Sequence, residues 1–322
     1  MEQPLPKLPP ENLDLETPSP FIEDTFVQWA WDATSLGYLK TCPRLYQYII
    51  IEGWRTRQEN IDLRFGGEVH EGIEHYHKAR ASGLGHDDAL YDVILETIRR
   101  IEGWNPDLET KAGKYKNRFT LIRTLVDYLD HYENDPATTV LKPNGEPAVE
   151  LTFRVKLEFT PTDDASQPYE LCGHIDRMVE FQGSKFALDT KTTTQTLGSY
   201  YFDQWEPNNQ MTLYTIAADA LQSDAHVKGT IIDAIQIMQS ETRCVRSITY
   251  RTQEQLTEWL DDLTYWLGVA QYYAHSNYWP MNDTACRMCR FRDICSKDPG
   301  VREKFLEGNF ERGERWNPLV PR

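Results

Sequence analysis

The hydrophobic pattern of this chain changes its period near Val149. Before that point, apolar residues recur at helical spacing and predict helices over about 65–80, 86–102 and 118–133. From Val149 to Phe159 apolar and polar residues alternate, which is typical of a strand with one buried face. A chain with this order must combine a mainly helical part with a sheet that follows it.

The rest of the sequence predicts more strands and two further helices. The strands fall at about 169–181, 185–193, 229–238 and 243–250, and the helices at about 207–221 and 253–276. The order of helices, three strands, a helix, two strands and a helix predicts an α+β fold. We expect four regions: a flexible acidic, proline-rich tail at 1–25, a helical part at 26–145, a core with the sheet at 146–278, and a cysteine-containing segment with a tail at 279–322.

The composition excludes several classes of protein. Of the 322 residues, 40% are hydrophobic, which is enough for a sizeable core and excludes global disorder. No run of about 18 apolar residues predicts a membrane span, and Met1–Pro4 does not begin a secretory signal. Six cysteines are too few for a disulfide scaffold. We therefore expect a cytoplasmic protein without a membrane partner.

The charge balance narrows the class of partner. The net charge of −16 argues against a passive nucleic-acid coat, but it is compatible with an enzyme that has one local basic groove. The basic run Lys111–Arg118 precedes a helical pattern. A solvated loop and a phosphate-contacting surface explain this run about equally well.

Three charged residues on a predicted hairpin form the first candidate site. Asp189 and Lys191 are two apart on a strand, so their side chains share a face. Asp176 on the preceding strand pairs with Asp189 if the turn centres on Gln182-Gly183, and with Lys191 if it centres on Gly183-Ser184. Two carboxylates beside an ammonium suit Mg²⁺ or Mn²⁺. An ordinary cross-strand ion pair is the alternative.

Polar residues outside the hairpin could complete this site. Gln210 opens the next predicted helix, and Tyr214 follows one turn later on the same face. His70 lies on the 65–80 helix, where Glu74 occupies the position at which a zinc-protease motif requires a second histidine, so that motif is excluded. A lone helical histidine is often simply hydrogen-bonded in place. Aromatic residues also crowd the loop after the hairpin, where packing is the favoured role and base stacking the alternative: Tyr200, Tyr201, Phe202 and Trp205.

The cysteines form a second constellation. Cys286, Cys289 and Cys295 have the spacing C-x2-C-x5-C, and Cys42 lies far upstream in Cys42-Pro43-Arg44. Such close cysteines in a reducing compartment favour zinc or an iron–sulfur cluster, although a zinc ribbon would normally supply two C-x2-C pairs. The remaining two cysteines lie in strand patterns and are interpreted as packed side chains: Cys172 and Cys244.

Taken in order, these motifs resemble the PD-(D/E)XK nuclease superfamily in its RecB-like iron–sulfur branch. That branch includes AddB-type nuclease domains, CRISPR-associated adaptation nucleases and related exonucleases. The resemblance covers about residues 34–297, and the second acid is Asp189 where many members carry Glu. The matching motifs are Ser35-Leu36 with Cys42-Pro43-Arg44, Gly66 with His70, Gly173-His174-Ile175-Asp176-Arg177, Asp189-Thr190-Lys191-Thr192, Gln210 with Tyr214, and the final C-x2-C-x5-C.

The resemblance implies a restriction-endonuclease-like core, in which a mixed sheet is flanked by helices, and metal-dependent phosphodiester hydrolysis. Asp176, Asp189 and the Thr190 carbonyl would hold Mg²⁺ or Mn²⁺, with His70 as a further ligand. Lys191 would orient or help to deprotonate the attacking water and stabilise the charge on the phosphate. The resemblance also implies roles for three further residues. Gln210 would position the phosphate or Lys191, and Tyr214 would support Gln210. Glu150 would contact the metal ligands without binding the metal itself.

The resemblance also implies a [4Fe–4S] cluster on Cys42, Cys286, Cys289 and Cys295, which would join the two chain ends. The implied function is that of an exonuclease on single-stranded DNA or DNA ends, in recombination, repair or CRISPR adaptation. DNA would be one partner, and a helicase, recombination or adaptation protein another. Two alternatives remain: a non-catalytic DNA-binding or clamp subunit, in which an acid or the lysine is often lost, and a zinc-stabilised interaction module.

Overall fold

A computed structural model of the protein describes residues 17–160, 167–221 and 226–320. Within them the chain forms two compact units, each built from separated segments. Unit 1 combines the described residues up to Gln58 with Thr152–Gly173 and the part from Gln253 onward, and unit 2 combines Glu59–Leu151 with His174–Thr252. The tail predicted at 1–25 falls mainly in residues 1–16, which lie outside the described residues.

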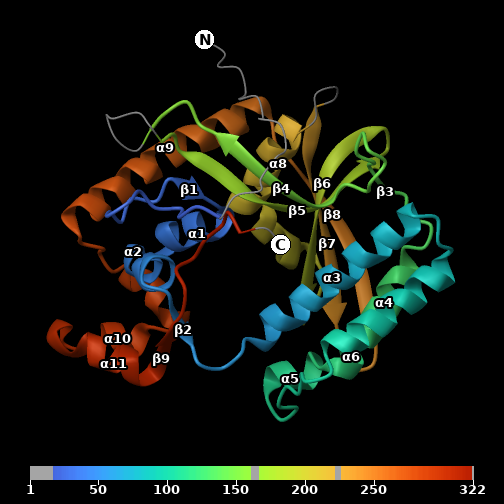
Figure 1. The fold of residues 1–322 in the computed structure, drawn as a ribbon, viewed down its shortest axis with the longest axis horizontal. Helices are drawn as coiled ribbons and strands as arrows, with labels where there is room; N and C mark the ends of the chain where they lie inside the picture. Colours follow the sequence, from blue (N-terminus) through green and yellow to red (C-terminus); the bar gives the residue numbers. More distant parts are fainter. Residues whose placement is uncertain (1–16, 161–166, 222–225, 321–322) are drawn as a thin grey trace. The chain divides into compact units, whose positions relative to one another are not determined.

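Strands of the described chain form one seven-stranded sheet (Figure 1). They are β1 (Ala30–Trp31), β3 (Thr138–Thr139), β4 (Val149–Lys156), β5 (Glu170–Phe181), β6 (Ser184–Thr193), β7 (Val227–Ile237) and β8 (Thr242–Tyr250). β5 pairs antiparallel with β6, β6 pairs parallel with β7, and β7 pairs antiparallel with β8. Since both directions occur, the sheet is mixed, and the predicted α+β fold is confirmed.

One group of helices in unit 2 covers one face of this sheet. It consists of α3 (Ile61–Ala81), α4 (His86–Arg100), α5 (Lys111–Tyr115) and α6 (Arg118–His131). Phe65 of α3 and Leu125 of α6 share a buried apolar cluster with Ile235 of β7. α3 and α6 approach closely at Gly72, where a Cβ would stand 2.6 Å from Cδ2 of Leu125. This contact fixes α3, which carries His70.

A second group of helices covers the opposite face. It consists of α7 (Ser199–Phe202), a 3₁₀ turn (Asp203–Trp205) and α8 (Asn209–Leu221). Leu197 and Tyr201 form a buried cluster with Ala234 of β7, whereas the next residue, Ile235, packs with the first group. Neighbouring residues of a strand point to opposite faces. The sheet of unit 2 is therefore flanked by helices on both sides.

The β5–β6 hairpin takes one of the two predicted registers. Arg177 pairs with Leu188 and Phe181 pairs with Ser184, so the turn centres on Gln182-Gly183. Both turn residues have positive φ, 50° and 70°, as a two-residue turn of type I′ requires. Continued by one residue, this register sets Asp176 opposite Asp189.

Unit 1 contains segments from both halves of the sequence. Its elements in addition to β1 and parts of β4 and β5 are α1 (Ala33–Thr41), α2 (Pro43–Tyr46), a π-helical turn (Gln47–Ile51), β2 (Trp54–Thr56), α9 (Gln253–Ser276), 3₁₀ turns (Asp283–Met288 and Pro299–Val301), α10 (Arg292–Cys295), α11 (Arg302–Asn309) and β9 (Phe310–Arg312). β2 pairs antiparallel with β9. Tyr48, Phe291 and Phe310 share a buried apolar cluster, so early and late segments form one core.

Most predicted elements are present with shifted ends. The helix predicted from residue 65 begins at Ile61, because the Asn60 side chain accepts hydrogen bonds from the N–H groups of Asp62 and Leu63. Apolar spacing does not reveal such a cap. The strand predicted to end at Phe159 ends at Lys156. No helix among the described residues is long and apolar enough to span a bilayer.

Candidate active site

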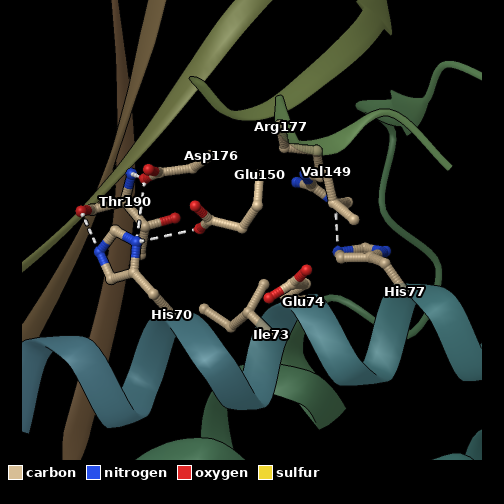
Figure 2. A pocket seen from close by; sticks show the side chains of 9 residues that line it. All are labelled: His70, Ile73, Glu74, His77, Val149, Glu150, Asp176, Arg177 and Thr190. Atoms are coloured by element: carbon tan, nitrogen blue, oxygen red, sulfur yellow. Dashed lines mark hydrogen bonds and ion pairs between the residues drawn. The ribbon is translucent and has the colours of Figure 1, made fainter. Parts of the chain in front are cut away.

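A pocket in unit 2 gathers several residues that the sequence singled out (Figure 2). It lies between α3 and the strands β4, β5 and β6. The lining residues are His70, Ile73, Glu74 and His77 from α3, Val149 and Glu150 from β4, Asp176 and Arg177 from β5, and Thr190 from β6. The residues from α3 are three to four positions apart, so one face of a single helix forms one wall.

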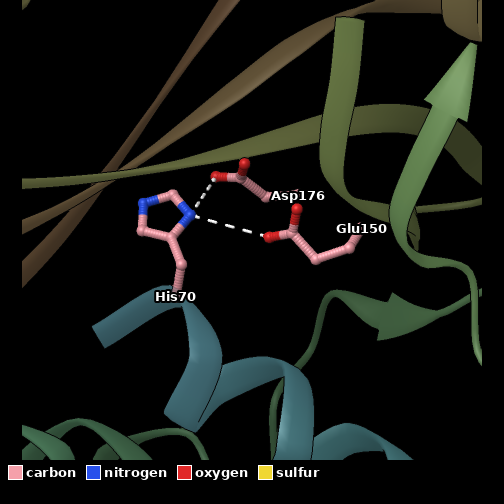
Figure 3. A group of neighbouring side chains, drawn as sticks. All are labelled: His70, Glu150 and Asp176. Carbon is pink, nitrogen blue, oxygen red and sulfur yellow. Dashed lines mark ion pairs between the residues drawn. The ribbon is translucent and has the colours of Figure 1, made fainter. Parts of the chain in front are cut away.

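His70, Glu150 and Asp176 form a compact group of potential metal ligands (Figure 3). Nδ1 of His70 lies 3.3 Å from Oδ2 of Asp176 and 3.8 Å from Oε1 of Glu150. One ligand atom from each residue lies within 4.8 Å of the other two. Among the described histidine, cysteine, aspartate and glutamate residues, no other group of three meets this criterion.

The backbone of Thr190 ties this group to β6. The N–H of Thr190 donates to Oδ2 of Asp176 at 2.7 Å, and Nε2 of His70 donates to the Thr190 carbonyl at 3.0 Å. The regular pairing of β5 with β6 reaches Arg177 and Leu188. Just beyond it, the carboxylate of Asp176 accepts a hydrogen bond from a backbone N–H of β6. This bond fixes the carboxylate relative to the strand.

Two carboxylates converge on one imidazole, and the pKa values reflect this. Burial by itself would lower the pKa of His70, but the charges and hydrogen bonds of Asp176 and Glu150 raise it to about 10. Burial would raise the pKa of Asp176, yet His70, Lys191 and the Thr190 N–H hold it below its usual value. In the absence of a metal, an imidazolium balances this negative charge.

Asp189 and Lys191 form an ion pair on β6. Nζ of Lys191 lies 2.7 Å from Oδ2 of Asp189, whose residue is only 1% exposed. Burial first, and the charge of Asp176 as well, raise the pKa of Asp189 to about 6 against the opposing charge of Lys191. The Lys191 ammonium also faces the ring of Trp205, 5.6 Å from its centroid. The three residues of the predicted hairpin site are thus electrostatic neighbours.

α8 carries the next two predicted residues. Nε2 of Gln210 donates to the Tyr214 hydroxyl at 2.9 Å, as their spacing on one helical face predicted. In the loop before this helix, Tyr201 is buried and its ring contacts those of Phe202 and Trp205. Tyr200 is 88% exposed. Packing therefore accounts for three of the four aromatic residues, and base stacking stays a prediction for Tyr200.

Glu150 is the residue that sequence reasoning placed too far from the ligands. Alternation along β4 identifies it as a polar residue of a half-buried strand, but it gives no distance to Asp176. In the structure Glu150 has a φ of 44°, a left-handed conformation that is uncommon for residues other than glycine. Its carboxylate reaches His70 from this position. Only this unusual backbone conformation distinguishes Glu150 from the other polar residues of β4, and the sequence does not predict it.

The chemistry of the His70–Glu150–Asp176 group fits a small divalent cation. Mg²⁺ and Mn²⁺ bind oxygen ligands at about 2.0–2.2 Å, which sets neighbouring ligand atoms roughly 3–4 Å apart. The three ligand atoms lie within 4.8 Å of one another, close to that requirement. Of the predicted ligand set, the structure brings His70, Asp176 and the Thr190 backbone together, whereas Asp189 pairs with Lys191.

A second pocket, in unit 1, is lined by four cysteines. Cys42 meets Cys286, Cys289 and Cys295 there, with Tyr48 and Phe291 among the apolar lining residues. The Sγ atom of Cys42 accepts a hydrogen bond from the N–H of Asn282 at 3.3 Å. The other two cysteines lie elsewhere: Cys172 is buried against the Trp31 carbonyl, and Cys244 packs on the α3–α6 core.

The spacing of these four cysteines is wider than a zinc site requires. Zinc binds thiolates at about 2.3 Å in a tetrahedron, which sets the sulfurs about 3.8 Å apart. No three of the four cysteines have Sγ atoms that all lie within 4.8 Å of one another. As they stand in the structure, the four thiols therefore do not form a closed tetrahedral zinc site.

Comparisons with known proteins give a family match. The model of the PD-(D/E)XK nuclease superfamily matches residues 30–296. The crystal structure of the "putative exonuclease" of Eubacterium rectale matches with a TM-score of 0.48 and 10% identity, over 84% of this chain and 90% of that chain. That of a protein named SSO0001 matches with a TM-score of 0.30 and 10% identity, over 84% and 87%. No curated protein matches this chain.

Proposed function

The chain belongs to the PD-(D/E)XK nuclease superfamily, and on this premise we propose that it is a metal-dependent deoxyribonuclease. One observation carries the proposal: His70, Glu150 and Asp176 offer three ligand atoms at one point of a pocket. The ion pair of Asp189 with Lys191 lies on the adjoining strand. A subunit that only bound DNA would have no need for this combination of ligands and ammonium.

The proposed site holds Mg²⁺ or Mn²⁺ between Asp176, Glu150 and His70. Bound there, the cation would lower the pKa of a water molecule and offset charge on the scissile phosphate. Asp176 is held in place by the Thr190 N–H and His70 by the Thr190 carbonyl. An imidazole among oxygen ligands shifts the preference towards Mn²⁺. Asp189 would complete the set or orient Lys191.

Lys191 supplies the positive charge that the reaction needs beside the cation. Its ammonium is held by Asp189 on one side and by the ring of Trp205 on the other. From there it would orient the attacking water and stabilise the negative charge that develops on the phosphate. Gln210, anchored by Tyr214, would position the phosphate.

We propose more specifically that the protein is an exonuclease that prefers single-stranded DNA or frayed ends and acts in recombination, repair or CRISPR adaptation. It is supported by the motifs in their order along the chain. The test incubates the full-length protein with end-labelled linear DNA and closed circular DNA, each single- and double-stranded, with Mg²⁺ or Mn²⁺. We expect cleavage of linear single strands from their ends and none in EDTA.

The controls of this experiment separate activity from mode of cleavage. The variant Asp176→Ala, purified in the same way, should not cleave any of the four substrates. Rapid cleavage of the single-stranded circle would contradict the exonuclease and leave an endonuclease. A wild-type protein that cleaves none of the substrates with either metal would overturn the nuclease itself.

The second cofactor that we propose is a [4Fe–4S] cluster in the cysteine pocket. Thiolates are the usual ligands of such clusters, and Cys42, Cys286, Cys289 and Cys295 line one pocket. Their spacing is wider than that of a zinc site. The test is the colour and metal content of protein purified without oxygen. A brown protein with about four irons supports the cluster, whereas a colourless protein with one zinc contradicts it.

A further inference from the structure

The segment from α5 to the start of α6 presents an unusual surface in an acidic protein. Lys111 and Lys114 are exposed, Arg118 is half-buried, and the ring of Phe119 is 83% exposed. These four residues are called the basic–aromatic patch below. No ion pair in the described chain involves its three basic side chains, although the whole protein has a net charge of −16. The patch therefore places three positive side chains without acidic partners beside one exposed aromatic ring.

Contacts within the protein explain the presence of the neighbouring Lys116, but they do not explain the patch residues. Lys116 is buried, its Nζ lies 2.8 Å from Oδ1 of Asp62, and it faces the ring of Phe65 at 5.7 Å. It joins α5 to the start of α3. Arg118, in contrast, occupies the first position of α6, where a positive charge opposes the helix dipole. Arg118 therefore does not stabilise its own helix through the dipole, whereas Lys114 lies in the last turn of α5, where its charge is favourable.

Lys116, which lies between the patch residues Lys114 and Arg118 in the sequence, joins this segment to the start of α3, the helix that carries His70. Asp62, which binds Lys116, precedes His70 by two turns, or about 12 Å along the axis. Midway between them, at Gly66, α3 passes β6, where a Cβ would lie 3.5 Å from Oγ1 of Thr192. Residues four apart share a helical face. An extended single strand covers the roughly 12 Å between these two positions of α3 in about four nucleotides, at 3.4 Å or more for each.

We propose that the basic–aromatic patch binds the single-stranded part of a DNA substrate whose scissile phosphate lies at the His70–Glu150–Asp176 group. The inference rests on the proposed function and adds to it the path of the strand. Lys111, Lys114 and Arg118 contact phosphates, and the exposed ring of Phe119 stacks on an unpaired base. Stacking requires an accessible base face, so the patch selects single strands over duplex.

The first test measures binding without cleavage. Anisotropy of a fluorescein-labelled 20-nucleotide oligo(dT) is recorded with the full-length protein in EDTA at several KCl concentrations. Phe119→Ala should weaken binding at least about 5-fold, the low end for one stacked base. Tyr91→Ala, which removes another ring that is 67% exposed in unit 2, should leave binding unchanged. Equal losses from both variants would contradict the patch.

The second test counts phosphate contacts. Each contact to a single strand contributes about 0.7 to the slope of log K against log salt, so Lys111→Ala/Lys114→Ala should reduce that slope by about 1.4. The control Arg80→Ala/Lys228→Ala removes two exposed charges of unit 2 away from the patch and should not change it. A slope that is the same in all three proteins overturns the inference, as does equally tight binding of a blunt duplex.

The third test separates this inference from the proposed function. Hydrolysis of bis(p-nitrophenyl) phosphate with Mn²⁺ reports on the catalytic group alone, because this diester is too small to reach the patch. The patch variants should retain wild-type hydrolysis of this ester, while their KM for the oligonucleotide rises and kcat stays the same. If the wild type hydrolyses neither substrate, the nuclease proposal fails, and the two binding experiments still decide whether the patch binds DNA. An unchanged KM in the patch variants would exclude the patch from substrate binding.

Discussion

At the scale of single residues, the proposed chemistry would depend on charges that the protein holds in fixed places. Asp176 accepts a hydrogen bond from the Thr190 N–H. The Lys191 ammonium contacts the Asp189 carboxylate and the ring of Trp205. The His70 imidazole lies between two carboxylates. Fixed charges are worth more in a reaction than mobile ones, because they need no reorganisation as the phosphate changes its charge.

Removal of one of these charges should therefore abolish activity without unfolding the protein. We expect Asp176→Ala and Lys191→Ala each to lower kcat by about 10²–10³-fold, the usual effect of one lost electrostatic partner. Steady-state cleavage of labelled DNA measures the effect, and circular dichroism checks the fold. Asp92→Ala, which removes an exposed carboxylate on α4, is the matched control. Near wild-type cleavage by either variant would remove that residue from the mechanism.

Glu150 combines a strained backbone conformation with a place in the proposed metal site. Its φ of 44° is disfavoured for glutamate, and such strain costs about 1–3 kcal/mol. We expect Glu150→Gly to lose Mn²⁺ affinity without a loss of unfolding free energy, since glycine accepts this conformation. Glu150→Gln keeps the strain and should lose affinity alone. Isothermal titration and urea unfolding in EDTA measure the two effects. Unchanged Mn²⁺ affinity in both variants would exclude Glu150 as a ligand.

At the scale of elements, the sequence restricted the hairpin to two registers but could not choose between them. Both Gln182-Gly183 and Gly183-Ser184 are acceptable turns. The observed turn sets Gln182 at a φ of 50°, which is accessible to a non-glycine residue at moderate cost. The choice follows from how both strands pack, and local turn preferences do not contain that information.

A buried ionic network beside the pocket was beyond sequence reasoning for a similar reason. Arg177 donates to His77 at 2.7 Å and to Asp135 at 2.9 Å. Arg246 of β8 also donates to Asp135, and it donates to Asp233 of β7 at 2.8 Å. These partners come from α3, a loop and three strands, so no local motif joins them. The network fixes the residue that follows Asp176.

His77 gives this network a pH dependence. Burial first, and the charge of Arg177 second, hold the pKa of His77 well below its ordinary value of 6.5. Below pH 6.5 the unfolded chain therefore binds a proton that the folded protein does not. The free energy of unfolding consequently decreases as the pH is lowered. The stability that neutral His77 contributes is complete above pH 6.5 and is lost below it.

The expected result is a difference between two pH profiles measured by urea unfolding in EDTA. Relative to His77→Gln, whose amide oxygen can still accept from Arg177, the wild type should lose up to about 1.4 kcal/mol of unfolding free energy per pH unit below 6.5. His226→Gln, at a side chain that is 97% exposed, should leave the profile unchanged. Parallel profiles for wild type and His77→Gln would show that His77 is protonated in the folded protein.

At the scale of the whole molecule, the order of elements and the main motifs could be read from the sequence, and the division into units could not. Periodicity identifies each helix and strand from its own residues. The units join segments that are far apart in the chain, and β4 and β5 each contribute residues to both. Long-range packing decides this, as it decides that Cys42 meets Cys286 in one pocket.

Cys42 should matter for the stability of unit 1 out of proportion to its size. A cluster held by Cys42 and Cys295 would close a loop of most of the chain, which by analogy with a disulfide contributes about 5–6 kcal/mol. We expect Cys42→Ala to lose visible absorbance, lower the melting temperature and expose the segment after residue 279 to proteolysis. Cys172→Ala, at a buried cysteine outside the pocket, should keep the colour. The reverse result would identify a different fourth ligand.

The alternation of segments between the two units has a consequence for synthesis. Unit 2 has its last residues at Thr252, whereas unit 1 needs the chain beyond Gln253. A ribosome that adds about 5–20 residues per second therefore delivers the whole of unit 2 first. Cys42 emerges early and waits on the order of tens of seconds for Cys286, Cys289 and Cys295. Cys42 is therefore synthesised long before its three pocket neighbours, and a cluster held by all four cysteines could form only after Cys295 has been added.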